Sequence, residues 1–239
     1  DATIATADIA NDAVTAAKIS NNEDFTINSI TVGKGANSGS QNIAIGDSAL
    51  DAITSGGRNT AIGSNALTDC TSGQNNVCVG SNAGENITTS ENNVAVGHDA
   101  MEENTTGDNN IAIGARALEE NTTASNNTAV GYEALTENTT GAKNTAVGTS
   151  ALTSNVTGAD NTAVGQNCLA SNTTNSNTAV GRYAMNANTT GTEQVAVGKG
   201  ALSANTTGNY NLAIGYNALD AQTTASDNLA IGYNAVGAN

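Results

Sequence analysis

The phrase "NTAVG" occurs at residues 127–131 and again at residues 144–148, and close variants of it recur along most of this chain. Each copy ends on a glycine, and successive glycines are 17 residues apart, with one interval of 16 residues. A period this short and regular indicates a solenoid, in which each coil of chain stacks on the previous one. The twelve glycines are Gly46, Gly63, Gly80, Gly97, Gly114, Gly131, Gly148, Gly165, Gly181, Gly198, Gly215 and Gly232. We therefore predict about twelve stacked coils over residues 42–239.

The positions of a coil, numbered from its glycine as position 0, separate into fixed and variable classes. Position −1 is Val or Ile, position −2 is Ala except for Cys78, and position −4 is Asn except for Gln194. Ala recurs at +3 except for Cys168, and Leu, Met or Val recurs at +4 except for Gly84. Charged residues of the coils lie only at +1, +2, +5, +6, +11 and +12. The fixed positions are thus predicted to be buried, and the variable positions to meet water.

The fixed phrase is predicted to be a strand, because β-branched residues recur at −3 and −1, as with Thr128 and Val130. Alternation puts −3 and −1 on one face of the strand and −4 and −2 on the other. Neither face carries a charge, so both are expected to be buried, yet a narrow solenoid of one chain has a single interior. The second face therefore needs a partner, and identical chains around a common axis are the simplest one.

The rest of each coil completes the prediction of an all-β fold, a parallel β-solenoid. Ala134 and Leu135 represent a second run that is expected to form the opposing wall of the interior. The "NTTG" piece at residues 138–141 has the residue types of a turn. The Asn at −4 is expected to form a stacked ladder of side-chain amides rather than to bind a ligand.

Composition and charge argue against several functions. Cys70, Cys78 and Cys168 are odd in number and lack metal-ligand spacing, and the latter two stand in the Ala positions as small buried residues. No metal site or cofactor is therefore expected. The net charge of −15 and pI near 4.1 make nucleic acid an unfavourable partner. No stretch approaches the ~20 apolar residues of a membrane span, so no membrane insertion is expected.

Catalysis is not expected either, and we predict that the chain is not an enzyme. The single histidine, His98, lies at a variable +1 position, where an exposed side chain is expected. Carboxylate pairs such as Glu102 with Glu103 and Glu119 with Glu120 also lie at variable positions and indicate a solvated acidic surface. The sequence has no phosphate-binding loop, zinc motif or EF-hand pattern.

The residues before the coils have a different apolar period. Ile4, Ile9, Val14 and Ile19 recur every five residues, a period that fits neither a single helix nor a simple strand. We divide the chain into an N-terminal oligomeric stem (1–27), a lead-in segment (28–41) and the repeat region (42–239). The start lacks the basic and apolar regions of a signal peptide and lacks Met, so we expect a processed chain or a section of a longer one.

Three stretches carry a resemblance to a known family. They are "NTAVGYEALTENTTG" at 127–141, "INSITVGKG" at 27–35 followed by "NIAIG", and "DIANDAVTAAKIS" at 8–20. The chain resembles the tail fibres of phages, cyanophages included, and its repeats are similar to the YadA-like heads of trimeric autotransporter adhesins, which have a shorter coil. The resemblance covers nearly the whole chain and implies a parallel homotrimer of left-handed β-rolls outside a virion or cell. Family members often end in a self-cleaving chaperone domain, which is not visible here.

The resemblance implies a structural role: a tail-fibre shaft or receptor-binding segment on the virion exterior that mediates host attachment. Its expected partners are copies of itself, other fibre or virion proteins, and a host receptor such as a glycan. Candidate recognition residues are the tyrosines at +1 or +2, namely Tyr132, Tyr183, Tyr216 and Tyr233. A bacterial trimeric surface adhesin is the alternative. An ice-binding solenoid is a weaker one, because paired threonines such as Thr105 and Thr106 are adjacent and would face opposite ways in a strand.

Overall fold

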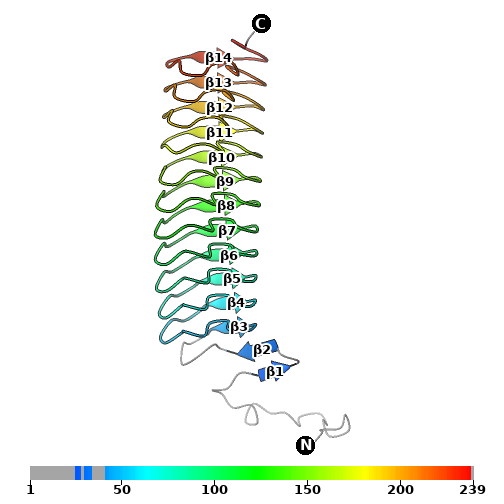
Figure 1. The fold of residues 1–239 in the computed structure, drawn as a ribbon, viewed down its shortest axis with the longest axis vertical. Coiled ribbons are helices and arrows are strands. Elements are labelled where there is room, and N and C mark those ends of the chain that lie inside the picture. Colours follow the sequence, from blue (N-terminus) through cyan, green and yellow to red (C-terminus); the bar gives the residue numbers. More distant parts are fainter. Residues whose placement is uncertain (1–24, 28–29, 34–40, 238–239) are drawn as a thin grey trace, which may run out of the picture.

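The computed structural model describes residues 25–27, 30–33 and 41–237, and within them it is a single stack of short strands (Figure 1). Fourteen strands form one sheet whose spatial order is the order of the sequence. The strands are β1 (Phe25–Ile27), β2 (Ile30–Gly33), β3 (Ile43–Ile45), β4 (Thr60–Ile62), β5 (Val77–Val79), β6 (Val94–Val96), β7 (Ile111–Ile113), β8 (Thr128–Val130), β9 (Thr145–Val147), β10 (Thr162–Val164), β11 (Thr178–Val180), β12 (Val195–Val197), β13 (Leu212–Ile214) and β14 (Leu229–Ile231). The five-residue apolar period of the predicted stem lies outside the described residues.

The strands β3 to β14 are parallel and pair in one constant register, which confirms the predicted parallel β-solenoid. Coil position aligns with coil position, so that Ala129 of β8 pairs with Ala146 of β9. The start of the sheet differs, because β1 and β2 form an antiparallel hairpin and β2 pairs antiparallel with β3. This hairpin was not predicted. No helix long and apolar enough to cross a membrane occurs in the part of the chain that the structure describes.

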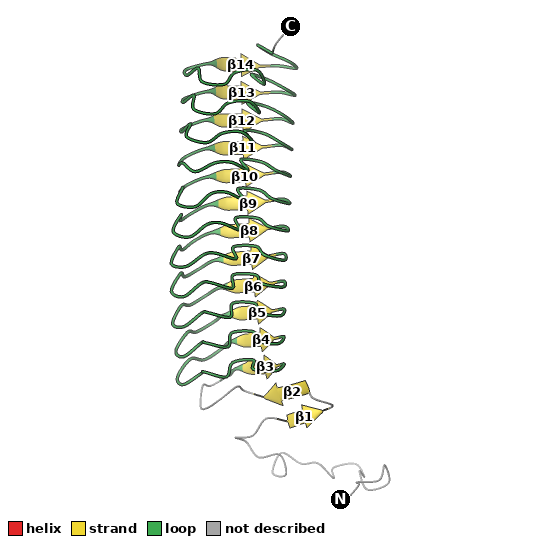
Figure 2. Cartoon of the chain, in the orientation of Figure 1, coloured by secondary structure: helices red, strands yellow, loops and turns green. Residues whose placement is uncertain are grey.

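Each coil contains one strand, and its remaining walls are turns that follow one another from coil to coil (Figure 2). These turns hydrogen-bond along the stack much as strands do: the backbone N–H of Leu118 donates to the Ala134 carbonyl at 3.0 Å. The leucine at +4 has a left-handed backbone, with φ of 54° at Leu135. That conformation costs about 1–2 kcal/mol for a residue with a Cβ, and burial of the leucine side chain, worth roughly 1.5–3 kcal/mol, offsets it.

The interior is built from the predicted positions. Ala at −2 and +3 and the large residue at +4 are buried in the coils, as Ala129, Ala134 and Leu135 show with no exposed surface. Cys78 and Cys168 occupy two of the Ala positions and are fully buried, as expected. The core is therefore a narrow column of small side chains, with one larger apolar side chain in most coils.

The asparagines at −4 form the predicted ladder. The backbone N–H of Asn144 donates to Oδ1 of Asn127 at 2.8 Å, one coil away. Nδ2 of Asn127 donates to the Gly141 carbonyl at 2.9 Å, so the same amide also closes the "NTTG" turn. Each side chain thus satisfies a donor and an acceptor that would otherwise be buried without partners.

A second column of buried amides, at position +7, was not predicted. Nδ2 of Asn121 donates to Oδ1 of Asn104 at 2.8 Å, and the pattern continues toward the C-terminus. The column comprises Asn104, Asn121, Asn138, Asn155, Asn172, Asn188 and Asn205. The first three coils have Ile53, Cys70 and Ile87 at this position, so they fill the same space with apolar side chains. Where Gln222 replaces Asn, the column stops, and Oδ1 of Asn205 is left buried without a hydrogen bond.

The single coil of 16 residues keeps the register of its neighbours. Thr162 of β10 still pairs with Thr178 of β11. Thr174 stands where other coils have the turn residue, usually Gly; its carbonyl accepts from Nδ2 of Asn161 at 2.6 Å, and its hydroxyl donates to the Gly191 carbonyl at 2.7 Å. The deletion is absorbed in the turn, and the strand ladder is unaffected.

Candidate functional site

Positions −3 and −1 of β3 to β14 form the outward face of the sheet, an exposed and largely apolar surface along the described stack. The structure shows that the Ala and Asn face is the interior, and that the β-branched face points away from it: Ile113 is 41% exposed and Ala112 beside it 0%. More than a third of each of these side chains is exposed: Ile43, Ile62, Ile111, Ile113, Val147, Val164, Val180, Val195, Val197, Ile214, Leu229 and Ile231. Within one chain, therefore, only one of the two faces of the strand is buried.

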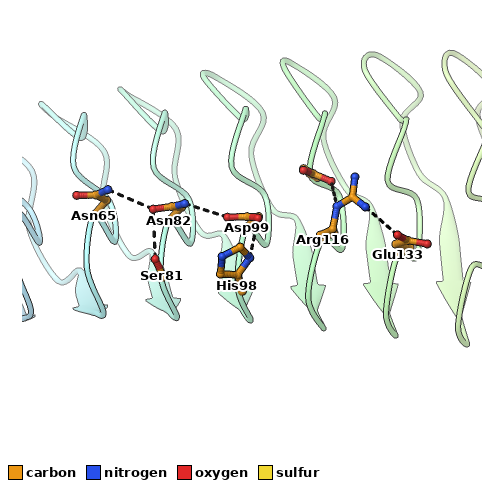
Figure 3. A network of polar contacts seen from close by, with 8 residues as sticks. Asn65, Ser81, Asn82, His98, Asp99, Arg116 and Glu133 are labelled. Atoms are coloured by element: carbon orange, nitrogen blue, oxygen red, sulfur yellow. Dashed lines mark hydrogen bonds and ion pairs between the residues drawn. The ribbon is translucent and has the colours of Figure 1, made fainter.

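A row of polar side chains at +2 runs along the stack just after the strands (Figure 3). Nδ2 of Asn65 donates to Oδ1 of Asn82 at 3.2 Å, and Nδ2 of Asn82 donates to Oδ1 of Asp99 at 3.0 Å. The next side chain, Arg116, bonds Glu119 through Nε at 2.7 Å and Glu133 through Nη1 at 2.8 Å. The row ties neighbouring coils together by polar contacts outside the core.

The carboxylates of Asp99, Glu102 and Glu119 come close enough for one oxygen of each to lie within 4.8 Å of the others. Partial burial, with the nearby Asp99 charge second, raises the pKa of Glu102. However, Glu119 is already engaged by the guanidinium of Arg116 at 2.7 Å. The cluster is therefore explained as part of the acidic side of the solenoid, and we assign no metal to it.

His98, the single histidine, lies beside this cluster. Its Nδ1 is 2.6 Å from Oδ2 of Asp99, and its side chain is 63% exposed, as its +1 position predicted. An exposed imidazole with one carboxylate neighbour is an ordinary surface pair. That the chain is not an enzyme stays a prediction.

The four tyrosines singled out from the sequence all lie on the surface, but in two different settings. Tyr132 is 51% exposed and lies next to Arg116, whose charge is balanced by two glutamates. Tyr216 and Tyr233 belong to neighbouring coils and stack with ring centroids 5.3 Å apart and planes 9° apart. Tyr183 lies beneath the guanidinium of Arg182. Sequence reasoning missed the fifth tyrosine, Tyr210, which is 56% exposed at position +12.

The threonine pairs do not offer a flat array of free hydroxyls. In the pairs before the last, the first threonine uses its hydroxyl within the stack: Oγ1 of Thr105 donates to the Thr122 carbonyl at 3.0 Å, and Oγ1 of Thr122 donates to the Thr139 carbonyl at 3.1 Å. Thr106, the second member of its pair, is exposed. This arrangement weakens the case for an ice-binding plane.

The three cysteines are expected to be unreactive in the folded protein. Burial raises the pKa of the Cys70 thiol to about 11 and that of Cys168 to about 12, and burial also raises the pKa of Cys78. Because the thiolate is the reactive form, a maleimide at pH 8 should label none of them until guanidinium unfolds the chain, after which all three should react. A Ser64→Cys variant at an exposed +1 position is the control and should react at once; equally rapid labelling of the unsubstituted protein would contradict the described core.

Comparison with protein families, with curated proteins and with solved structures finds no match for this chain. Its function is therefore argued from the geometry of its surface.

Proposed function

We propose that this chain is a structural fibre protein: a homotrimeric shaft or receptor-binding segment of a virion tail fibre that mediates attachment to a host cell. The observation that carries the proposal is the outward face, a band of Val, Ile, Leu and Thr that runs along twelve strands in constant register. Contiguous exposed apolar patches larger than a few hundred Å² mark interaction sites. Three copies around one axis would bury their outward faces against one another.

The interior supports a mechanical role for such an assembly. Backbone bonds join each coil to the next on every side of the stack, and the amide ladders add bonds inside it, as between Asn127 and Asn144. A coil cannot open without breaking contacts to both neighbours, so local unfolding is costly. A stiff rod of this kind suits a shaft that holds a recognition surface away from the particle. A trimeric bacterial surface adhesin would use the same properties, and the source of the ligand would distinguish the two.

Light scattering on the purified protein, before and after mild SDS, tests the assembly. We expect the mass of three 23.6-kDa chains, and we expect that mass to survive the detergent. A double variant, Ile113→Glu and Val147→Glu, places two charges on the outward face and should yield monomers, because buried like charges repel. The control, Asn109→Glu and Asn126→Glu, adds the same charge at +12, where Glu193 already stands, and should remain trimeric. A monomeric unsubstituted protein would overturn the trimer and bring ice binding back into contention.

A further inference from the structure

The last coils carry a row of cationic and aromatic side chains that the fibre architecture does not require. Position +1 is Arg182, Lys199, Tyr216 and Tyr233 in four consecutive coils, and all four side chains are exposed. With Tyr183, the +2 residue beside Arg182, they form what we name the cation–tyrosine strip. One coil adds about 4.8 Å, so the strip presents a new side chain at that interval along the stack.

The members of the strip form two contacting groups, Arg182 with Tyr183 and Lys199 with Tyr216 and Tyr233. The guanidinium carbon of Arg182 lies 4.6 Å from the ring centroid of Tyr183, and Nη2 of Arg182 donates to the Tyr183 hydroxyl at 3.3 Å. Nζ of Lys199 lies 5.3 Å from the ring centroid of Tyr216, and Tyr216 stacks on Tyr233. These contacts hold the cations and rings side by side on the surface, a pre-arranged platform rather than separate flexible side chains.

The charge around the strip differs from that of the rest of the repeat region. Residues 42–164 contain 14 of the 22 acidic residues, whereas residues 165–239 contain three, Glu193, Asp220 and Asp227. These three lie at +5 or +12, so none shares the row of the strip. Arg116 is paired with two glutamates, but neither Arg182 nor Lys199 has an ion pair within the described residues. The strip is therefore the place where an anionic ligand meets unpaired cations and the least repulsion.

We propose that the cation–tyrosine strip binds an acidic polysaccharide, a chain of sugars that carries carboxylate or sulfate groups. The apolar face of a sugar ring would pack along the exposed edges of the stacked Tyr216 and Tyr233 rings, and its acidic groups would pair with Arg182 and Lys199. A sugar ring is similar in length to one coil spacing, so successive sugars would match successive coils. This inference rests on the proposed attachment function and names the receptor class for it.

The strip and the outward face can be used at the same time. A +1 residue follows the turn glycine, so the strip lies beyond the C-terminal ends of the strands, along one edge of the outward face. Packing of three outward faces would leave such an edge at the periphery, and a trimer would carry three strips.

Binding of the full chain to immobilised polygalacturonate tests the strip, with dextran as the neutral glycan and single-stranded DNA as the polyanion without pyranose sugars. We expect polygalacturonate to bind and to weaken with added salt, and the other two to bind at least tenfold more weakly. Lys199→Glu and Tyr216→Ala should each weaken binding at least tenfold. The matched controls are Lys143→Glu, with the same charge change at +12, and Tyr132→Ala, at the same +1 position; both should bind as the unsubstituted protein does.

Each other outcome overturns the proposal. Equal binding of dextran would remove the role of the cations, equal binding of DNA would make the strip a general polyanion site, and equal losses in the control variants would place the ligand elsewhere. No binding of polygalacturonate by a protein that light scattering shows to be trimeric would overturn the strip and leave the fibre proposal standing. If the protein were monomeric and bound polygalacturonate, and Lys199→Glu abolished that binding, the strip would stand and the trimeric fibre would be overturned.

Discussion

Replacing Gly131 with alanine is expected to lower the thermal midpoint of unfolding more than any surface substitution in this chain. Gly131 has φ of +141°, which L side chains rarely adopt, and an added Cβ would lie 2.6 Å from the carbonyl carbon and oxygen of Gly148 in the next coil. Both atoms belong to the backbone, so relief requires neighbouring coils to separate. We expect the free energy of unfolding to fall by about 3–5 kcal/mol, the range of the most damaging single substitutions. The thermal midpoint, measured by circular dichroism during heating, checks this.

Gly57→Ala is the matched control for that substitution. Gly57 lies at +11, where other coils already carry Ala142 and Ala159, so an alanine there should leave the midpoint almost unchanged. If the thermal midpoint of Gly131→Ala equalled that of Gly57→Ala and of the unsubstituted protein, the described close approach of glycines in neighbouring coils would be contradicted.

Replacing Asn127 with aspartate is expected to destabilise the core at neutral pH and to do so less at acidic pH. The carboxylate keeps the acceptor for the N–H of Asn144 but cannot donate to the Gly141 carbonyl, and it buries a charge. An unsatisfied buried group costs about 1–3 kcal/mol, and more for a charged group. Burial raises the pKa of this aspartate above its value in the unfolded chain. The destabilisation is thus full above the folded-state pKa and declines as pH falls through it, because the protonated acid can donate again.

The difference in unfolding midpoint between this variant and the unsubstituted protein, measured from pH 8 to pH 4, checks the effect. Asn126→Asp is the control, because Asn126 is exposed at +12, a position that Asp160 and Asp227 occupy in other coils. It should show no such pH-dependent difference. A midpoint for Asn127→Asp that equals the control at every pH would show that the ladder contributes little to stability.

Much of the fold could be predicted because the repeat supplies twelve observations of the same coil. Ala at −2, the large residue at +4 and the Asn ladder were each identified because they vary little between coils, and nearly all of these residues lie in the interior. The buried column at +7 was not predicted because its residue type varies: Ile53, Cys70 and Ile87 precede the asparagines. An amide column and an apolar column fill the same space, and only the structure shows that the two kinds of side chain share one buried position.

The candidate surface could be predicted less well, because its features depend on neighbours in space. Alternation identified two faces of the strand, but which face is inside follows from the direction in which the chain bends at each turn. Four tyrosines were selected by residue type and by their variable +1 or +2 positions, whereas the stack of Tyr216 on Tyr233 and the cation near it are seen only when neighbouring coils are placed in space. The antiparallel hairpin of β1 and β2 lies outside the repeat, so the repeated positions carried no information about it.

Because the register between coils is constant, the number of coils sets the length of the stack. Each added coil lengthens the stack by about 4.8 Å and leaves the cross-section as it was. The 16-residue coil shows that the stack tolerates a shorter turn. Thr162 still pairs with Thr178, and the missing residue is accommodated in the turn at Thr174. Duplication or loss of whole coils outside the cation–tyrosine strip therefore changes how far the chain extends without changing the strip. The distance that the stack spans and the chemistry of the strip can therefore change separately.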